Sequence, residues 1–320
     1  MLSTASRLPL RRIDGSVFVS HFDAPALTDA SDNNVLLFGG GGQVGHALQA
    51  CMPFAGQLVV ATRRDCDLTD ANSVRMLVRR VRPKIIVNAA AYTAVDKAES
   101  DRGTCFAVNA TGPAVMAAEA AALGAKLVQY STDYVFDGSK TAPYVEGDPT
   151  GPLNIYGASK LAGEQRIAEA GCEFLILRTS WVYSNHGANF LKTMLRLRTE
   201  RPELRIVADQ HGAPTSANAI AEATVRILDQ IDTVGWMNGV YHMTAAGATT
   251  WYGFAKAIFA RTVGSVPSLV PIGTADYPTP AVRPANSILS NDKFAGNLGF
   301  CLPDWEQQLD AVMAARAIAG

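Results

Sequence analysis

The sequence lacks an excess of charge of either sign. Its 320 residues carry 28 lysines and arginines against 29 aspartates and glutamates, which gives a formal net charge of −1. Proteins whose main ligand is nucleic acid usually show a strongly basic footprint, because they must neutralise phosphates. The balance therefore argues against nucleic acid as a partner. A small anionic substrate stays compatible with it, because a few local arginines are enough to bind one.

Cysteine is scarce, and its spacing excludes two kinds of site. The chain has five cysteines, Cys51, Cys66, Cys105, Cys172 and Cys301, an odd number without a CxxC pair. This pattern predicts reduced thiols in a cytoplasmic protein, and it is not typical of a disulfide framework or a thiolate zinc site. The five histidines form no HExxH or comparable cluster, so we predict no metal site.

Long apolar runs are also missing, since no stretch approaches the ~20 apolar residues that a membrane helix requires. The Ala-rich stretch from Ala114 is interrupted by Glu119 and Lys126, so we predict no membrane partner. At 48% hydrophobic and 18% charged residues, the chain is too apolar to be disordered. Its length suits one large α/β domain or two unequal ones with a sizeable core.

Residues 1–33 lack helical and strand periodicity. They are not a secretory signal, because Arg11, Arg12, Asp14 and Asp23 interrupt every apolar stretch. The acidic residues also disfavour a transit peptide. We interpret 1–33 as a disordered tail, or as the product of a start codon assigned too far upstream.

From Asn34 onward, short apolar strands alternate with helices. Strands are predicted at Val35–Phe38, Leu58–Ala61, Lys84–Val87, Lys126–Tyr130 and Phe174–Leu177. Helices are predicted at Val44–Met52, Ser73–Val81, Gly112–Leu123 and about 157–170. Such alternation indicates parallel strands buried on both faces by helices. The predicted fold is α/β, a Rossmann-like doubly wound parallel sheet, with an NAD(P)-binding domain at 34–180.

This regularity loosens beyond Arg178, where proline and glycine punctuate the chain. Helices are predicted near Ala188–Arg198, Asn218–Asp229, Trp251–Ala260 and Asp304–Ala317. We predict that residues 181–320 form a smaller α/β lobe, mainly for substrate binding, from which some segments return to the first domain.

A glycine turn follows the first predicted strand directly. Gly39, Gly42 and Gly45 keep the spacing Gly-x-x-Gly-x-x-Gly and lead into a helix. Glycine there permits a tight turn, close approach of the backbone to a pyrophosphate, and close contact between helix and strand. Four consecutive glycines are also compatible with a flexible loop. The strand before and the helix after favour a dinucleotide site, to which Gln43 and Val44 would contribute.

The end of the second strand bears on the choice of cofactor. The strand leads into Thr62-Arg63, and an arginine here suits the 2′-phosphate of NADP, whereas an acidic residue would suit NAD. NADPH is therefore favoured over NADH, although surface arginines are common without a ligand. Asp67 and Leu68 follow. Asp67 is either a cofactor contact or the N-cap of the next helix.

The third strand leads into Ala91, Tyr92 and Thr93. Open α/β sheets bind ligands at the carboxyl ends of their strands, where small side chains let a cofactor approach the backbone. The alanines before Tyr92 could equally serve packing. Their position favours a cofactor contact, which we also expect at Tyr130 of the fourth strand.

The fourth strand and the helix after it carry the candidate chemical groups. Thr132 ends a Tyr-Ser-Thr run, and Tyr156 and Lys160 lie at positions i and i+4 near a helix start, so that they share a face. A nearby ammonium would stabilise the Tyr156 phenolate and lower its pKa, and Thr132 would offer a second hydroxyl to the same carbonyl. A lone Tyr-x-x-x-Lys is common on helix surfaces, but downstream of the glycine turn it indicates a catalytic pair.

Together these motifs resemble the extended short-chain dehydrogenase/reductases and, within them, the dTDP-4-dehydrorhamnose reductases. The resemblance rests on the glycine turn, on Asn88-Ala-Ala-Ala, on the string from Ser131 to Gly138, and on Tyr156-x-x-x-Lys160. Further matching strings begin at Asp96, Arg178, Asp209 and Arg283. The resemblance therefore extends from about Asn34 to the C-terminus.

The resemblance implies a reaction: a nicotinamide cofactor reduces the 4-keto group of dTDP-4-dehydro-β-L-rhamnose to give dTDP-L-rhamnose, a precursor of cell-surface polysaccharide. It implies that Tyr156 donates the proton and that Lys160 holds the nicotinamide ribose. It also implies that Asp133 touches the sugar and that Trp181 forms a flat apolar wall for it. For Arg283 two interpretations stay open, a contact with the substrate's diphosphate or an exposed side chain before a proline.

The sequence departs from some members of that family at a metal site. Those members bind Mg²⁺ at a dimer contact through glutamates, and the corresponding places here read His46-Ala47 and Ala217-Asn218. Hard cations need oxygen ligands, so we predict neither the metal nor that route to a dimer. A homodimer is still one option for the assembly.

Two other functions stay open. A nucleotide-sugar epimerase shares the glycine turn and the Tyr/Lys pair but recycles its cofactor, and the related dehydratases are disfavoured because Tyr134 stands where they carry a glutamate. A non-catalytic regulatory subunit, like that of methionine adenosyltransferase, also resembles this family. The intact Thr132, Tyr156 and Lys160 argue against that second function.

Overall fold

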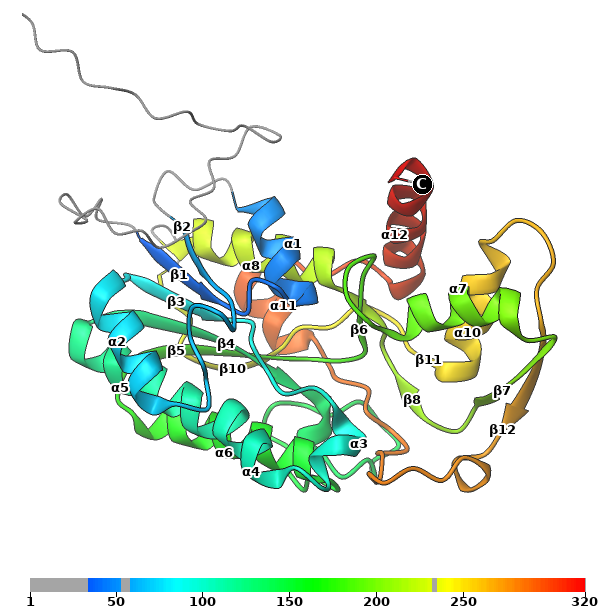
Figure 1. The fold of residues 1–320 in the computed structure, drawn as a ribbon, viewed down its shortest axis with the longest axis horizontal. Helices are drawn as coiled ribbons and strands as arrows, with labels where there is room; N and C mark the ends of the chain where they lie inside the picture. The colour runs from blue at the N-terminus through cyan, green and yellow to red at the C-terminus, as the bar shows by residue number, and fades with distance from the viewer. Residues whose placement is uncertain (1–33, 53–57, 232–234, 320) are drawn as a thin grey trace, which may run out of the picture.

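A computed structural model gives the structure of residues 34–52, 58–231 and 235–319. The tail predicted at 1–33 lies outside these residues. Figure 1 shows a sheet covered by helices on both faces, with a smaller lobe beside it. The predicted α/β class and Rossmann-like parallel sheet are confirmed.

The central sheet has six strands, all paired in parallel, in the order β10-β5-β4-β3-β1-β2. Their bounds are β1 (Val35–Phe38), β2 (Leu58–Ala61), β3 (Ile85–Asn88), β4 (Lys126–Thr132), β5 (Glu173–Thr179) and β10 (Gly239–His242). Because β2 and β3 lie on opposite sides of β1, the winding reverses at β1, which is where open α/β sheets bind their ligands. The carboxyl end of β1 therefore defines the place to look for a site.

Alternating strand residues bury both faces of the sheet. Val35 and Leu37 of β1 belong to one core cluster, with α1 (Gln43–Cys51), α8 (Ala217–Asp229) and α11 (Asp292–Leu298). Leu36 and Phe38 belong to the other, with α2 (Ala71–Val81), α5 (Gly112–Leu123) and α6 (Ile155–Glu169). Figure 1 shows these two groups of helices on opposite sides of the strands. Two-sided burial explains why each strand reads as a continuous apolar run.

Three local differences from the sequence-based expectations matter for the site. Strands β4 and β5 run beyond their predicted ends to Thr132 and Thr179, and β10 was not predicted at all. The N-cap of α2 is Asp70, which accepts a hydrogen bond from the backbone N of Asn72 at 2.9 Å. The N-cap interpretation of Asp67 is wrong, because a turn separates it from the helix and its carboxylate accepts from the backbone N of Thr69 instead.

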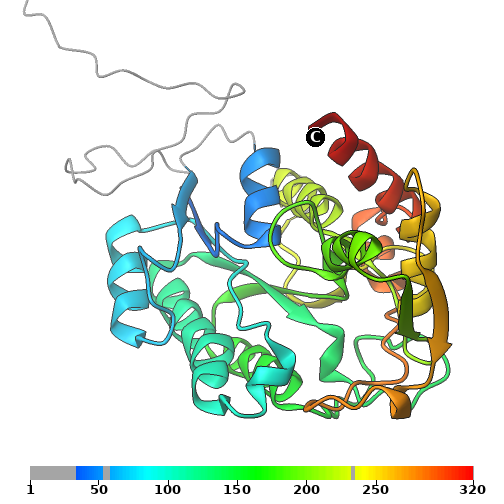
Figure 2. The ribbon, with the colours of Figure 1, turned by 45° about the vertical axis from the view of Figure 1, so that its right-hand side comes forward.

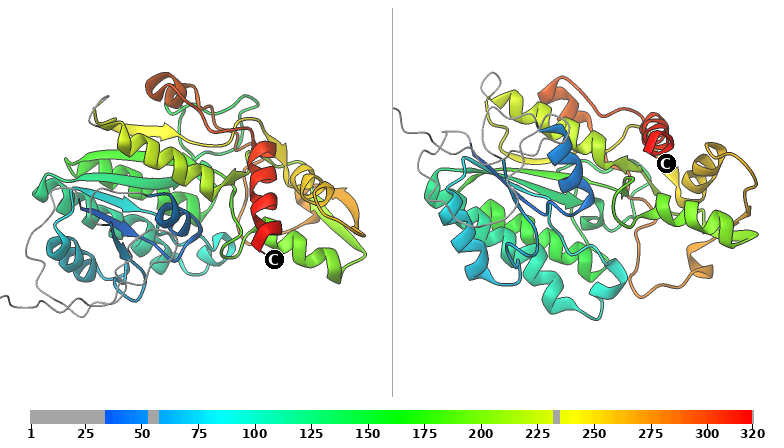
Figure 3. Two further views of the ribbon diagram at one scale, coloured as in Figure 1. Left: turned by 90° about the horizontal axis from the view of Figure 1, so that it is seen from above. Right: turned by 45° about the horizontal axis from the view of Figure 1, so that its top comes forward.

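The lobe has its own core. Its main elements are α7 (Phe190–Glu200), α10 (Trp251–Ala260), α12 (Trp305–Ala319), β7 (Glu203–Val207) and β12 (Ser268–Ile272). Short pairs link it to the sheet side: β6 (Val182–Tyr183) with β9 (Thr215–Ser216), and β8 (His211–Gly212) with β11 (Thr249–Thr250). In Figures 2 and 3, α12 stands where the sheet and the lobe meet. Strand β10 and helix α8 lie on the sheet side, so segments after Ser180 do contribute to the central sheet and its cover.

One helix is longer than the sequence suggested. Helix α4 (Arg102–Phe106), the π-helical η1 (Ala107–Thr111) and α5 run on as one 22-residue helix, Arg102–Leu123, long and apolar enough by length and composition to cross a membrane. The prediction that no run reaches this length is therefore wrong, because the helix begins well before Ala114. Its residues Met116, Ala117 and Ala120 are buried under the sheet. The helix packs in the core, and core helices can meet the same criteria of length and composition as membrane-spanning helices.

Candidate functional site

The glycine turn is shaped by two contacts that leave no room for side chains. Gly39 has a φ of +82°, and a Cβ built on it would lie 2.5 Å from the backbone N of Ala90. A Cβ on Gly45 would lie 2.1 Å from the carbonyl O of Gly39. Gly42 is the N-cap of α1 and has no side chain to cap the helix. The backbone N–H groups of the first turn are therefore left without a capping acceptor. This cradle fits a pyrophosphate bound at a helix N-terminus.

A loop from the lobe reaches back to this turn. The side-chain amide of Gln43 donates to the carbonyl of Val182 and accepts from the side chains of Ser184 and Asn189, at 3.0 and 2.8 Å. His186 places Nε2 3.2 Å from the carbonyl O of Gly41. The Gln43 side chain is therefore hydrogen-bonded to the lobe. If Gln43 contacts the cofactor as predicted, the contact comes from its backbone, next to that of Val44.

The residues predicted to choose the cofactor lie at the end of β2. Asp65 accepts hydrogen bonds from the backbone N of Thr62, at 2.8 Å, and from its hydroxyl, at 2.7 Å. This turn leaves Arg63 exposed next to the carboxyl end of β1. Asp67 is exposed and Leu68 is partly buried in the turn that follows. The Asp65 carboxylate is thus bound to Thr62. The Arg63 guanidinium can therefore face an anionic group of a cofactor.

The segment after β3 is held by a residue that sequence reasoning missed. Asn109, in η1, accepts from the backbone N of Tyr92 at 2.8 Å and donates to its carbonyl at 3.0 Å. It also donates to the hydroxyl of Ser159 on α6 at 3.0 Å. Ala91 and Tyr92 are partly buried, and Thr93 is exposed. The sequence offered only a weak signal, a polar residue in a mostly apolar stretch. The π-helical turn on which Asn109 lies, a feature common at functional sites, is visible only in the structure.

Tyr156 lies where β4 ends, because α6 begins close to it. Asn154 caps α6 by accepting from the backbone N of Gly157 at 2.8 Å. A Cβ on Gly157 would lie 2.2 Å from the carbonyl O of Tyr134, so only glycine permits this approach. The rings of Tyr156 and Tyr134 meet edge to face at 5.9 Å. The Thr132 hydroxyl faces the Tyr156 phenol, so the predicted pair of hydroxyls is brought together.

Lys160 is buried one turn further along α6. Its ammonium donates to the carbonyl O of Tyr130 at 2.6 Å. The Tyr130 phenol instead reaches Thr224 Oγ1 on α8 at 2.7 Å, under the sheet. Tyr130 therefore contributes to the site through its carbonyl, and its predicted cofactor contact does not come from the phenol.

The pKa of Tyr156 moves in the direction opposite to the expected one. Burial raises it well above its usual range, and Lys160 does not lower it. The expectation of a lowered pKa is wrong for this structure, because the Lys160 ammonium is committed to the Tyr130 carbonyl and burial disfavours the phenolate. Burial also lowers the pKa of Lys160 to about 8. Tyr156 is thus held as a protonated phenol at neutral pH, which suits a proton donor.

Asp133 follows Thr132 directly and is fully buried in the same place. Its Oδ1 accepts from the Thr132 hydroxyl at 2.9 Å. Burial raises the pKa of this carboxyl to about 6. The group that the resemblance places against the sugar therefore sits beside both candidate hydroxyls.

Trp181 stands at the end of β5 in a left-handed backbone conformation, φ 47°. Its ring stacks on that of Trp251 with centroids 3.6 Å apart and planes 6° from parallel. Gly212 lies against it, since a Cβ there would come within 2.5 Å of Trp181 Cε2. A non-glycine residue in this conformation costs about 1–2 kcal/mol, and the stacking offsets part of that cost. Trp251 is a second residue of this wall that the sequence did not single out.

Arg283 is neither exposed nor unpaired. Its guanidinium forms two bonds to the carboxylate of Asp96 in α3 (Val95–Ala98), at 3.0 and 2.8 Å. The same contact holds the pKa of Asp96 below its usual range. The interpretation of Arg283 as an exposed side chain is wrong, because the fold brings the segment around it against α3. The contact with a diphosphate stays a prediction.

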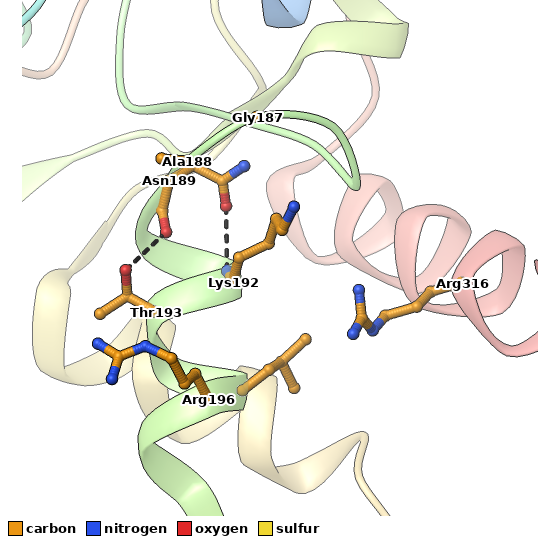
Figure 4. A pocket seen from close by; sticks show the side chains of 8 residues that line it. Gly187, Ala188, Asn189, Lys192, Thr193, Arg196 and Arg316 are labelled. Atoms are coloured by element: carbon orange, nitrogen blue, oxygen red, sulfur yellow. Dashed lines mark hydrogen bonds between the residues drawn. The ribbon is translucent and has the colours of Figure 1, made fainter. Parts of the chain in front are cut away.

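A separate cleft of about 500 Å³ lies between α7 and the end of α12. Figure 4 shows Lys192, Arg196 and Arg316 around it, below the Gly187–Asn189 backbone. Arg196 pairs with Glu200 of its own helix at 2.6 Å. Neither Tyr156 nor the glycine turn lines this cleft, so it is distinct from the candidate site.

Comparison with known proteins gives one family and several close relatives. The model of the RmlD substrate binding domain matches residues 33–318. The chain is 49% identical over 282 residues to the dTDP-4-dehydrorhamnose reductase of Burkholderia thailandensis (strain E264), covering 85% of this chain and 95% of that one. It is 45% identical to the enzyme of that name from Escherichia coli (strain K12), covering 85% and 94%.

A solved structure agrees with these sequence matches. The chain resembles the dTDP-4-dehydrorhamnose reductase from Bacillus anthracis in complex with NADP, with a TM-score of 0.83 and 37% identity. The match covers 89% of this chain and 99% of that one. The similarity thus spans the sheet, the glycine turn and the lobe together.

Proposed function

The chain belongs to the RmlD family of dTDP-4-dehydrorhamnose reductases, and from that premise we propose that it reduces the 4-keto group of dTDP-4-dehydro-β-L-rhamnose to give dTDP-L-rhamnose. The protein is an NADPH-dependent oxidoreductase of dTDP-rhamnose biosynthesis. The observation that carries the proposal is the meeting of Thr132, Tyr156 and Lys160 at the carboxyl end of β4, on the same edge of the parallel sheet as the glycine turn.

The residues present fit a dinucleotide. The Gly39–Gly45 turn offers backbone N–H groups to a pyrophosphate, and Arg63 would meet the 2′-phosphate. Ala91, Tyr92 and Thr93, with Asp67 and Leu68, would line the rest of the cofactor. When bound, NADPH would supply the hydride for the reduction at C4. Every other part of the reaction falls to side chains of this chain.

Tyr156 would donate the proton to the oxygen at C4. Its raised pKa keeps the phenol protonated, and the Thr132 hydroxyl would share the same oxygen of the sugar. Lys160 would hold the nicotinamide ribose while its ammonium stays bound to the Tyr130 carbonyl. A general acid within hydrogen-bond reach of the forming alkoxide contributes about 10²–10⁴-fold in rate.

The sugar and its diphosphate would lie between the sheet and the lobe. Asp133 would accept a sugar hydroxyl, and Trp181, supported by Trp251, would form the apolar wall. Arg283 would reach the diphosphate from its place on Asp96. All five cysteines of the chain are free thiols, which supports work in the cytoplasm. The assembly, including a homodimer, stays open.

Two outcomes separate this reaction from its alternatives. Purified protein is mixed with NADPH and dTDP-4-dehydrorhamnose, and the absorbance of the reduced nicotinamide is followed. The absorbance should fall, and one NADPH should be oxidised for each sugar converted. NADH, assayed beside it, should be the poorer donor. Turnover of the sugar without net loss of NADPH would support an epimerase, and binding without turnover would support a regulatory subunit.

A further inference from the structure

Gln43 lies in the glycine turn, but its side chain is bound to the lobe. It is the first residue of α1. Its Nε2 donates to the carbonyl O of Val182 at 3.3 Å, and its Oε1 accepts from Nδ2 of Asn189 at 2.8 Å. These partners lie 139 and 146 positions further along the chain. Gln43 thus joins the turn that fits a pyrophosphate to a segment that only the complete fold brings beside it.

The orientation of the Gln43 amide follows from its two partners. Asn189 is the N-cap of α7, and its Oδ1 accepts from the backbone N of Lys192 at 3.1 Å (Figure 4). The nitrogen of the Asn189 amide is therefore the end that meets Gln43, and only an oxygen can accept from it. The Val182 carbonyl can only accept, so it requires the Gln43 nitrogen. Glutamine meets both requirements, whereas glutamate would meet only the first.

Val182 directly follows Trp181, the residue expected to form the apolar wall for the sugar. Trp181 has its left-handed backbone, φ 47°, between the end of β5 and the start of β6. Its carbonyl O accepts from the backbone N of Thr215 at 3.4 Å, and its ring stacks on that of Trp251. These two contacts hold Trp181 against later parts of the chain. The bond from Gln43 to the next residue holds the same segment against the glycine turn.

The loop of residues 182–189 packs along the N-terminal end of α1. The His186 ring stacks on that of His46 in α1, with centroids 4.2 Å apart and planes 11° from parallel. Gly187 has a φ of +71°, and a Cβ built on it would lie 3.4 Å from Cγ of Gln43. The loop therefore turns closely around the Gln43 side chain, whose two hydrogen bonds reach both of its ends.

We propose that Gln43 is a positioning residue that fixes the Trp181 wall relative to the cofactor turn, and so places C4 of the sugar against the nicotinamide. It acts through the backbone of Val182, and its side chain needs to touch neither the cofactor nor the sugar. Placement of this kind matters for the reaction, because a shift of about 1 Å between reacting groups can cost about 10²-fold in rate. This inference rests on the reduction proposed above.

The first variant is Gln43→Met, which keeps the length of the side chain and removes both hydrogen bonds. At saturating NADPH, kcat/KM for dTDP-4-dehydrorhamnose should fall by about tenfold, through a lower kcat as well as a higher KM. The dissociation constant for NADPH should change less than about twofold, because backbone N–H groups are expected to bind the pyrophosphate. Gln43→Glu keeps the bond from Asn189 but cannot donate to Val182, so it should lower kcat/KM to a similar extent.

Gln49 offers the matched control, because it is the same residue type on the same helix with contacts inside the turn. Its Nε2 donates to the carbonyl O of Gly40 at 2.7 Å and to that of Gly45 at 2.9 Å. Gln49→Met should weaken NADPH binding and leave kcat/KM for the sugar, measured at saturating NADPH, within about twofold. A general loosening of α1 would instead move the two methionine variants in the same way.

Two further measurements test the connection to Trp181. Gln43→Met should cost less in a Trp181→Phe background than in the wild type, because residues that act as a unit are not additive. Equal cost in both backgrounds contradicts the inference. Hydrogen exchange of the backbone amides of residues 181–189, followed by mass spectrometry, gives a readout without turnover. Exchange there should be faster in Gln43→Met than in the wild type, and unchanged in Gln49→Met.

The outcomes separate the inference from the proposed reaction. If the wild type oxidises NADPH and Gln43→Met keeps its kcat/KM for the sugar, the inference is wrong. It is also wrong if the Gln43 variants weaken NADPH binding as much as they lower kcat/KM. If Gln43→Met does not fold, Gln43→Glu decides by the same criteria. A wild type that never oxidises NADPH contradicts the proposed reaction, whereas unchanged hydrogen exchange at residues 181–189 in the Gln43 variants contradicts the inference alone.

Discussion

The glycine turn and the sugar side of the site are assembled in different ways. In the turn, Gly39, Gly42 and Gly45 are close in sequence, and the glycines themselves make their closest contacts with one another and with the ends of β2 and β3. Among the described residues, the lobe reaches the turn only at Gln43 and Gly41. On the sugar side, Arg283 meets Asp96 across 187 positions of sequence, and Asn154 donates to Val282 across 128. The glycines of the cofactor region are thus shaped mainly by the nearby strand ends, while the sugar region exists only when the whole chain is folded.

Because the two regions are assembled differently, substitutions in them should change the affinities for different ligands. A substitution beside the glycine turn, Gln43 excepted, should alter the affinity for the cofactor alone. One in the long-range contacts should alter the affinity for the sugar alone. Tyr156 stands where the two regions meet, so its removal should affect the chemistry and neither affinity.

The largest effect is expected for Tyr156→Phe. Loss of the phenolic proton should lower kcat by about 10³-fold, because the Thr132 hydroxyl at the same oxygen is a much weaker acid than a phenol. The dissociation constant for NADPH, measured by fluorescence, should change less than twofold. Unchanged kcat would refute the role of proton donor, and loss of NADPH binding would show that the Tyr156 hydroxyl also supports the cofactor.

A smaller effect is expected for Arg283→Lys. A lysine keeps the charge but cannot bridge the Asp96 carboxylate through two N–H groups. KM for the sugar should rise by about tenfold, which corresponds to ~1.4 kcal/mol and to the lower end of what a hydrogen bond to a charged group contributes. NADPH affinity should not change.

Asp96→Asn is the matched variant for this pair. If Arg283 acts only through its ion pair with Asp96 of α3, both variants should raise KM for the sugar equally. A larger rise in the Arg283 variant would support a direct contact with the diphosphate. A change in NADPH affinity in either variant would contradict the division between the two regions.

The smallest effect is expected for Arg63→Ala. Exposed charge pairs contribute about 0.2–1 kcal/mol, so KM for NADPH should rise by about fivefold or less while KM for NADH stays the same. The neighbouring exposed Arg64→Ala, assayed in parallel, serves as the control. If KM for NADH rises as much as KM for NADPH, Arg63 does not discriminate between the two cofactors.

Much of the fold could be predicted because its signals are local. The strands β1 and β2 and the helix α10 have the predicted bounds, since apolar runs and helical spacing mark them directly. Strand β10 and the pairing of β7 with β12 were missed. Their short strands pair with partners far along the chain, and tertiary contacts of this kind leave little trace in a short window of sequence.

The site divides along the same line. Gly39, Gly45, Thr132, Tyr156 and Lys160 were found from spacing, and the structure brings the last three together. Asn109 and Trp251 were missed, because each acts through a contact with a distant residue. The pKa of Tyr156 was predicted in the wrong direction, since burial and the commitment of Lys160 to a carbonyl cannot be read from a four-residue spacing.

The most direct test of the account follows a label through one turnover. NADPH deuterated at C4 of the nicotinamide is mixed with dTDP-4-dehydrorhamnose and excess protein, and the sugar is examined by NMR and mass spectrometry. We predict one deuterium at C4 of the sugar and one NADP⁺ for each product formed. Product without deuterium, or sugar converted while all the cofactor stays reduced, would contradict it.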